Sequence, residues 1–141
     1  MSWLSQFLRS IGMGGGRARA PSPAPTVPTM PGPVDDQISE LVRLVNLHRQ
    51  RYGLRPCGVT GELSSSASSW ADMMNRGVGL RHRNPLPSDV FGEIIAWGYE
   101  TPNAVFNGWK NSPGHNAIML GDGFTRCGFG RAGDYWCGVF S

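Results

Sequence analysis

Apolar residues first recur at helical spacing close to the N-terminus. Within residues 2–11 they stand at positions 3, 4, 7, 8 and 11, which is one face of a helix with Ser2 as its N-cap. The glycines of residues 12–16 end this helix. A helix this short is not stable alone in water. We therefore expect residues 1–16 to fold as an anchoring helix against other protein chains, with a frayed leader and a membrane-surface helix as the alternatives.

The pattern changes twice further along the chain. Six prolines among small residues make residues 17–34 a semi-rigid linker that cannot build a packed core. Residues 35–141 then form the folded domain, in which helices and strands follow one another without regular alternation. This order predicts an α+β fold, a sheet with helices packed on it, rather than a wound parallel fold. The expected helices cover residues 35–52, 62–76, 101–112 and 115–120, and the expected strands cover residues 90–97, 124–131 and 135–140.

Charge and hydropathy exclude several classes of protein. The domain carries ten basic and ten acidic residues, so it lacks the clustered cationic surface that nucleic-acid binding needs. No segment approaches the roughly 20 apolar residues of a transmembrane helix. The N-terminus also lacks the basic leader, apolar run and cleavage site of a secretory signal peptide. If the protein is exported, we expect either another route or a chain that is already mature.

Three cysteines are too few for a disulfide framework, and none belongs to a Cys/His cluster with zinc spacing. Cys57 lies in a Pro-Cys-Gly turn. Cys127 and Cys137 flank the last hairpin at equal distances from Ala132, so in antiparallel strands they could face each other. A disulfide there would fit an extracellular or virion protein, and reduced core thiols would fit a cytosolic one.

Several short motifs follow one another along the domain in an order that is typical of a known protein family. The first helix contains Asn46 and Arg49, and a loop carries Leu-Arg-His at residues 80–82. Gly-Glu-Ile-Ile-Ala-Trp-Gly at residues 92–98 and Trp-Lys-Asn-Ser-Pro-Gly-His at residues 109–115 follow. Together with the final Cys-Gly-Phe-Gly, this order resembles the bacterial branch of the CAP superfamily, the cysteine-rich secretory, antigen five and pathogenesis-related (SCP-domain) proteins. The resemblance covers about residues 36–141.

The resemblance implies a three-layer α–β–α sandwich with a central antiparallel sheet. It also implies a cleft lined by two histidines and one or two glutamates, which by position are His82, His115 and Glu93. The second glutamate of the family is Ser112 here, a change that bacterial members often show. Two further departures are Ile94 for the usual Asn and Asn116 for the usual Arg.

Two imidazoles and a carboxylate are a common ligand set for zinc. His82 and His115 are therefore the candidate ligands of a divalent metal ion, and Glu93 is either a third ligand or a general base. Together these three residues are the candidate catalytic set. The alternative is purely structural, because a buried carboxylate needs hydrogen-bond partners and the histidines and loop backbone can supply them. No other cofactor is predicted, and His48 is left out of the site because a lone helix histidine is usually a packed residue.

Three functions remain open from the sequence. The first is a binding or adhesion module whose cleft takes a lipid, glycan, peptide or divalent ion from cell-surface or extracellular material. The second is a metal-assisted hydrolase or peptidase that uses the same cleft. The third is a structural component tethered through residues 1–34. A tethering helix, a proline spacer and a compact domain together favour a displayed module, extracellular or carried on a virion or cell-surface particle.

Overall fold

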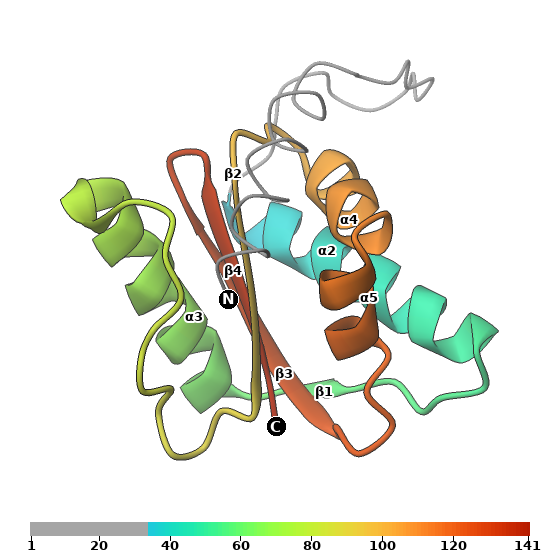
Figure 1. Cartoon of the computed structure of the whole chain (residues 1–141). Coiled ribbons are helices and arrows are strands. Elements are labelled where there is room, and N and C mark those ends of the chain that lie inside the picture. The colour runs from blue at the N-terminus through green and yellow to red at the C-terminus, as the bar shows by residue number, and fades with distance from the viewer. Residues whose placement is uncertain (1–33) are drawn as a thin grey trace.

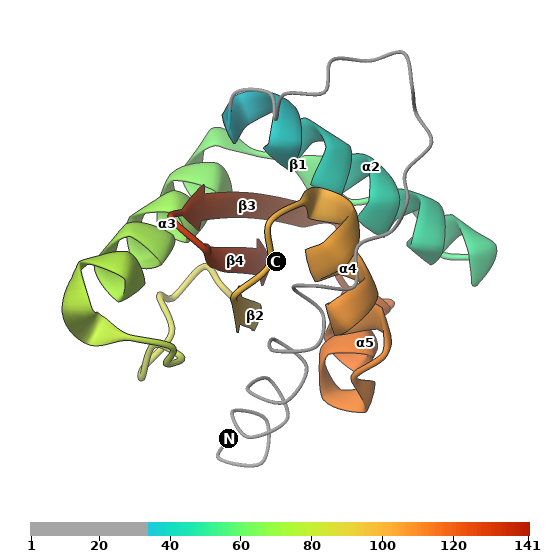
Figure 2. The same cartoon turned by 90° about the horizontal axis from the view of Figure 1, so that it is seen from above.

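Three layers make up residues 34–141, the part of the chain that the computed structural model describes. Helix α3 covers one face of a central sheet, and helices α2, α4 and α5 cover the other (Figures 1 and 2). The fold class predicted from the sequence is thereby confirmed. The predicted N-terminal helix, and the linker up to residue 33, lie outside the described residues. The elements are α2 (Val34–Arg51), β1 (Gly58–Val59), α3 (Gly61–Met73), the π-helical turn η1 (Met74–Val78), β2 (Gly92–Trp97), α4 (Pro102–Lys110), α5 (Pro113–Met119), β3 (Arg126–Ala132) and β4 (Tyr135–Phe140).

The sheet has the strand order β1-β3-β4-β2. Strands β2, β4 and β3 are antiparallel, as expected, whereas the two-residue strand β1 pairs with β3 in parallel and was not predicted. A strand of two residues carries no alternation of apolar and polar positions, so the sequence gives no signal for it. Strands β1 and β2 are therefore the two edges of the sheet.

Capping residues start the helices where the sequence indicates. The Thr60 hydroxyl accepts from the Leu63 amide at 3.1 Å, and the Thr101 hydroxyl accepts from the Ala104 amide at 3.1 Å. Helix α5 starts at Pro113, two residues earlier than expected, because a proline suits the first helical position. Residues 112–114, which were predicted to end α4, thus also start α5.

Helix α3 lies unusually close to the sheet because two residues of β3 beneath it are glycines. A Cβ atom on Gly128 would come within 2.2 Å of the Leu63 carbonyl carbon, and one on Gly130 within 2.5 Å of Ser68 Cα. No side chain fits at either position, since real Cβ atoms do not approach backbone atoms so closely. In β3 the two glycines therefore give the strand a flat face against α3. Cys127 and Phe129, which alternate with them, point to the opposite face of the sheet, where the other helices pack.

Cys127 and Cys137 do not face each other, so of the two alternatives that the sequence left open the structure favours reduced thiols. In the hairpin Cys127 lies opposite Phe140, and Cys137 lies opposite Gly130. The turn is centred on Gly133 and Asp134 rather than on Ala132, which shifts the register by an odd number of residues and sends the two side chains to opposite faces. All three cysteines are buried, free thiols.

Candidate functional site

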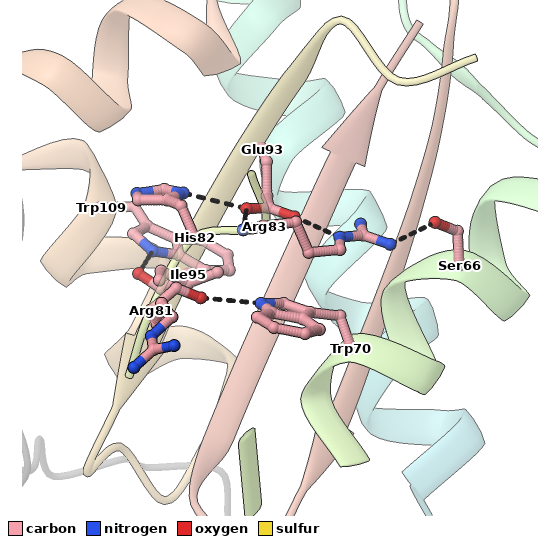
Figure 3. A network of polar contacts seen from close by, with 8 residues as sticks. All are labelled: Ser66, Trp70, Arg81, His82, Arg83, Glu93, Ile95 and Trp109. Atoms are coloured by element: carbon pink, nitrogen blue, oxygen red, sulfur yellow. Dashed lines mark hydrogen bonds and ion pairs between the residues drawn. The ribbon is translucent and has the colours of Figure 1, made fainter. Parts of the chain in front are cut away.

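The predicted site residues meet at the β2 edge of the sheet. Residues 79–91 connect η1 to β2 and carry His82. This loop is fixed to α3 by the Trp70 indole, whose Nε1 donates to the Arg81 carbonyl at 2.8 Å (Figure 3). Helix α4 is fixed to the strand itself, since the buried Trp109 donates from Nε1 to the Ile95 carbonyl at 3.1 Å. The site is therefore built where the loop, the edge strand and the start of α5 come together.

Both carboxylate oxygens of Glu93 are held by the loop. Oε1 accepts from His82 Nδ1 at 3.0 Å and from the Arg83 amide at 3.1 Å, and Oε2 accepts from Arg83 Nε at 2.7 Å (Figure 3). The Arg83 guanidinium continues to Ser66 Oγ on α3 at 3.0 Å and lies over the Trp70 ring, 5.7 Å from its centroid. Glu93 is thus a buried anion with a charged partner, which is how proteins make such burial tolerable.

This environment decides what Glu93 can do. Burial alone would raise the pKa of its carboxyl group, but the hydrogen bonds from His82 and Arg83 outweigh burial, so the pKa lies below its ordinary value of 4.5. A general base works best with a pKa near the working pH. Glu93 is therefore a weak base that already accepts three hydrogen bonds, and its evident role is to orient His82.

His115 occupies the first turn of α5 and is completely buried. Its Nδ1 lies 2.6 Å from the hydroxyl of Ser112, the residue that precedes the helix. That hydroxyl makes no capping hydrogen bond to the backbone of α5, so it serves the histidine instead. Burial, with a smaller contribution from the charge of nearby His82, lowers the pKa of His115 to about 4 from 6.5. His115 is consequently a neutral imidazole at pH 7.

One nitrogen on each ring has no partner. Among the described residues, Nε2 of His82 and Nε2 of His115 are buried and make no hydrogen bond. Since Glu93 accepts from Nδ1 of His82, the neutral form of that ring carries its proton on Nδ1 and a lone pair on Nε2. The Ser112 hydroxyl can likewise accept from Nδ1 of His115, which leaves a second lone pair. Because His82 perturbs the pKa of His115, the two rings lie close enough to interact electrostatically.

The three predicted residues are thus brought together, but not as three ligands. No group of three or more His, Cys, Asp or Glu side chains within residues 34–141 is arranged to hold a metal ion. Imidazole Nε2 atoms are of the ligand type that zinc takes, while Glu93 fits the supporting role of a carboxylate that fixes a ligand histidine. The prediction of His82 and His115 as ligands stays a prediction.

Arg83 and Ser66 were missed from the sequence. A glutamate inside an otherwise apolar strand signals a buried cation nearby, yet arginines stand at positions 76, 81 and 83 before the strand, and the pattern does not choose among them. His48, which was left out of the site, hydrogen bonds through Nε2 to Asn116 Oδ1 at 2.7 Å. Asn116, where the family usually has Arg, therefore belongs to a contact between α2 and α5.

An α–β–α sandwich with two histidines and a glutamate at one sheet edge defines the class of fold, and comparison with known proteins gives the family. Residues 42–140 match the sequence model of CAP, the Cysteine-rich secretory protein family, and the chain belongs to this family. It is 32% identical over 130 residues to the protein YkwD of Bacillus subtilis (strain 168), covering 82% of this chain and 51% of YkwD. The chain thus spans about half the length of that relative.

Solved structures show the same fold. An extracellular protein containing an SCP domain from Bacillus anthracis superposes with a TM-score of 0.71 at 21% identity, covering 82% of this chain and 44% of the other. An outer surface protein from Borrelia burgdorferi superposes with a TM-score of 0.64 at 21% identity, covering 72% of this chain and 89% of the other. Among the helices that the structure describes, none is long and apolar enough to cross a membrane.

Proposed function

We propose that the protein is an extracellular binding module of the CAP family whose contact point is the pair of Nε2 atoms on His82 and His115. The ligand is a divalent metal ion such as zinc, or a polar group of a cell-surface lipid, glycan or peptide that reaches the same two nitrogens. In their neutral forms the two imidazoles present lone pairs that suit a metal or a hydrogen-bond donor, and a buried nitrogen without a partner is costly unless something binds it.

The observation that carries the proposal is the way Glu93 is used. Its hydrogen bond to His82 Nδ1 fixes the tautomer and the ring orientation, and Arg83 keeps the carboxylate ionised while it does so. Carboxylate–histidine pairs of this kind support ligand histidines in metal sites. Loop packing alone does not account for two buried imidazole nitrogens that make no hydrogen bond, so we infer that the polar network does more than hold the loop.

The same geometry weakens the hydrolase alternative. A metal-assisted mechanism needs a general base, and Glu93 has a lowered pKa and already accepts three hydrogen bonds. The Ser112 hydroxyl lies 2.6 Å from His115 Nδ1 and is engaged by that ring. Binding is thus the better supported use of the site.

Location and tethering complete the proposal. Two structural neighbours carry names that place them outside the cell or on its surface, which supports an extracellular role here. The helix and proline linker predicted for residues 1–34 would hold the domain on a larger assembly, such as a virion or a cell-surface particle. A chain that lacks residues 1–33 should keep the folded domain and lose attachment to that assembly, and unchanged attachment would remove this part of the proposal.

Zinc titration by isothermal calorimetry tests the contact point. We expect zinc to bind the wild-type chain at one site, and His82→Gln and His115→Gln each to weaken binding at least about tenfold, as loss of one of two protein ligands should. His48→Gln is the matched control, because His48 is a buried histidine whose Nε2 is already bonded to Asn116. Thermal unfolding of each variant establishes that it is folded.

Three outcomes would count against the proposal. Zinc that fails to bind at millimolar concentration would remove the metal from it. Zinc binding that survives both site variants would place the metal elsewhere. An equal loss in His48→Gln would mean that the variants act through general destabilisation rather than through the contact point.

A further inference from the structure

A second pair of reactive side chains lies at the opposite edge of the sheet. Cys57 directly precedes β1, and Cys127 is on β3, the strand with which β1 pairs. The Cys127 thiol donates to the Cys57 carbonyl oxygen, with Sγ at 3.9 Å. Two cysteines that are 70 residues apart in the chain therefore lie against each other.

The backbone around Cys57 is held by a side chain rather than by a continuous strand. Asn46 of α2 accepts from the Cys57 amide at 2.8 Å and donates to the Cys57 carbonyl at 2.9 Å. Strand β1 itself has two residues and pairs only with β3. A disulfide needs the sulfurs about 2 Å apart and fairly strict dihedral angles, and a short edge segment can adjust to these requirements more easily than a central strand.

The contact between the two cysteines, with the charge of Arg49, favours a thiolate on Cys57. The contact with Cys127, opposed by burial and supported by the positive charge of Arg49, lowers the pKa of the Cys57 thiol to about 7 from 9.0. The contact with Cys57 and burial raise the pKa of Cys127. Arg49 is fixed in place by four backbone carbonyls, so its charge is not cancelled by a carboxylate in these contacts. Cys57 is therefore the nucleophile of the pair and Cys127 the resolving thiol.

We propose that Cys57 and Cys127 are a modification site that becomes an intramolecular disulfide when the protein meets a small-molecule disulfide such as glutathione disulfide. The Cys57 thiolate attacks one sulfur of the reagent, forms a mixed disulfide and releases one thiolate. Cys127 then loses its proton and attacks the Cys57 sulfur, which expels the second thiolate. Two protein thiols are oxidised and one reagent disulfide is reduced to two thiols. This site is separate from the histidine pair and does not depend on its ligand.

Cys137 is the natural control within the same chain. It is also buried in the sheet, but it lies on the α3 face, opposite to that of Cys127. Burial raises the pKa of its thiol. It should remain a thiol under conditions that oxidise the other two.

Peptide mapping of the full chain tests the site directly. Trypsin, which cuts after Lys and Arg but not before Pro, separates the three cysteines into peptides 52–76, 127–131 and 132–141. The folded protein is treated with glutathione disulfide, alkylated and digested without reduction. We expect peptides 52–76 and 127–131 to be joined, with Cys137 alkylated. Three alkylated thiols, a bond to Cys137 or a dimer joined between chains would overturn the proposal.

A thermal measurement keeps the test independent of proteolysis. The new bond would close a loop of about 70 residues, and we expect oxidation to raise the Tm of the wild-type chain by about 10 °C. Cys137→Ala should keep this rise, and Cys127→Val should abolish it. If Cys127→Val fails to fold, Cys57→Ser serves in its place. A rise that persists without Cys57 or Cys127, or a wild-type Tm that oxidation leaves unchanged, would contradict the assignment.

Discussion

The two edges of the sheet each enclose an arginine, and the two arginines are satisfied in different ways. At the β2 edge, Arg83 is paired with the carboxylate of Glu93. At the β1 edge, Arg49 donates only to backbone carbonyls, those of Arg55, Met119, Gly121 and Phe124. The β2 arrangement neutralises its charge locally, whereas the β1 arrangement leaves a net positive charge in the core.

The difference explains what each edge can do. A neutralised pair fixes geometry, so Glu93 can orient His82 without leaving charge at the histidine pair. The pKa of Cys57 is lowered mainly by the contact with Cys127, and Arg49, a fixed positive charge held by carbonyls, lowers it further. The first edge is therefore built to present lone pairs, and the second to favour a thiolate.

The largest effect should come from removing Arg49. In Arg49→Met the four carbonyls lose their donor inside the protein, and we expect the free energy of unfolding to fall by about 4 kcal/mol. Arg51→Met, on the exposed side of the same helix, should change it by less than about 0.5 kcal/mol. Urea unfolding at pH 7 measures both. Similar losses in the two variants would mean that the carbonyl contacts of Arg49 are unimportant.

Removing the carboxylate at the other edge should cost somewhat less. Glu93→Gln leaves the Arg83 guanidinium buried without a counter-charge, and we expect a loss of about 3 kcal/mol. Replacing both residues with methionine should cost less than the sum of the two single replacements, because neither charge is then left unpaired. Additive losses in this double-mutant cycle would show that the pair is not coupled.

Acid should destabilise the protein through His115. The pKa of His115 is about 4 in the folded chain, below the ordinary value of 6.5. Between pH 4 and pH 6.5 this histidine is therefore protonated in the unfolded chain and neutral in the folded chain. Stability is therefore complete above pH 6.5 and falls as the pH drops toward 4. We expect a loss of about 2 kcal/mol between pH 7 and pH 5. The curve for His115→Gln should be nearly flat over this range, and an equal slope in that variant would assign the effect to another group.

The smallest effect concerns the serine that replaces the second glutamate of the family. Ser112→Ala removes the buried hydrogen bond to His115, and we expect it to lower stability by about 1 kcal/mol. Ser66→Ala, which removes a less buried contact to Arg83, should cost about half as much. Should Ser112→Ala be neutral, the hydroxyl would have no part in fixing the ring.

The sequence predicted those features that depend on local chemistry. Thr101 and Pro102 start α4, and Ser112, Pro113 and Gly114 separate it from α5, because caps and proline act within one turn. The motif order also brought His82, Glu93 and His115 to one site. These features need only the neighbouring residues or a family pattern.

Other features depend on contacts that no local pattern encodes. The hairpin register follows from where the turn closes, and an odd shift was enough to separate Cys127 from Cys137. The contact between Cys57 and Cys127 needs strand β1, which has only two residues. The partnership of Glu93 with Arg83 instead of another arginine depends on the path of residues 79–91. Such features require the assembled sheet.

The central claim is that Glu93 orients His82 so that Nε2 of His82 and Nε2 of His115 present lone pairs to the same ligand. NMR of the histidine side chains gives the most direct test of this claim. The chain has three histidines, so long-range ¹H–¹⁵N spectra can resolve each ring. At pH 7 without metal, His82 and His115 should both carry their proton on Nδ1. Zinc should then shift both Nε2 signals and leave those of His48 unchanged. A proton on Nε2 of His82, or zinc-induced shifts that spare His82 and His115, would contradict the account.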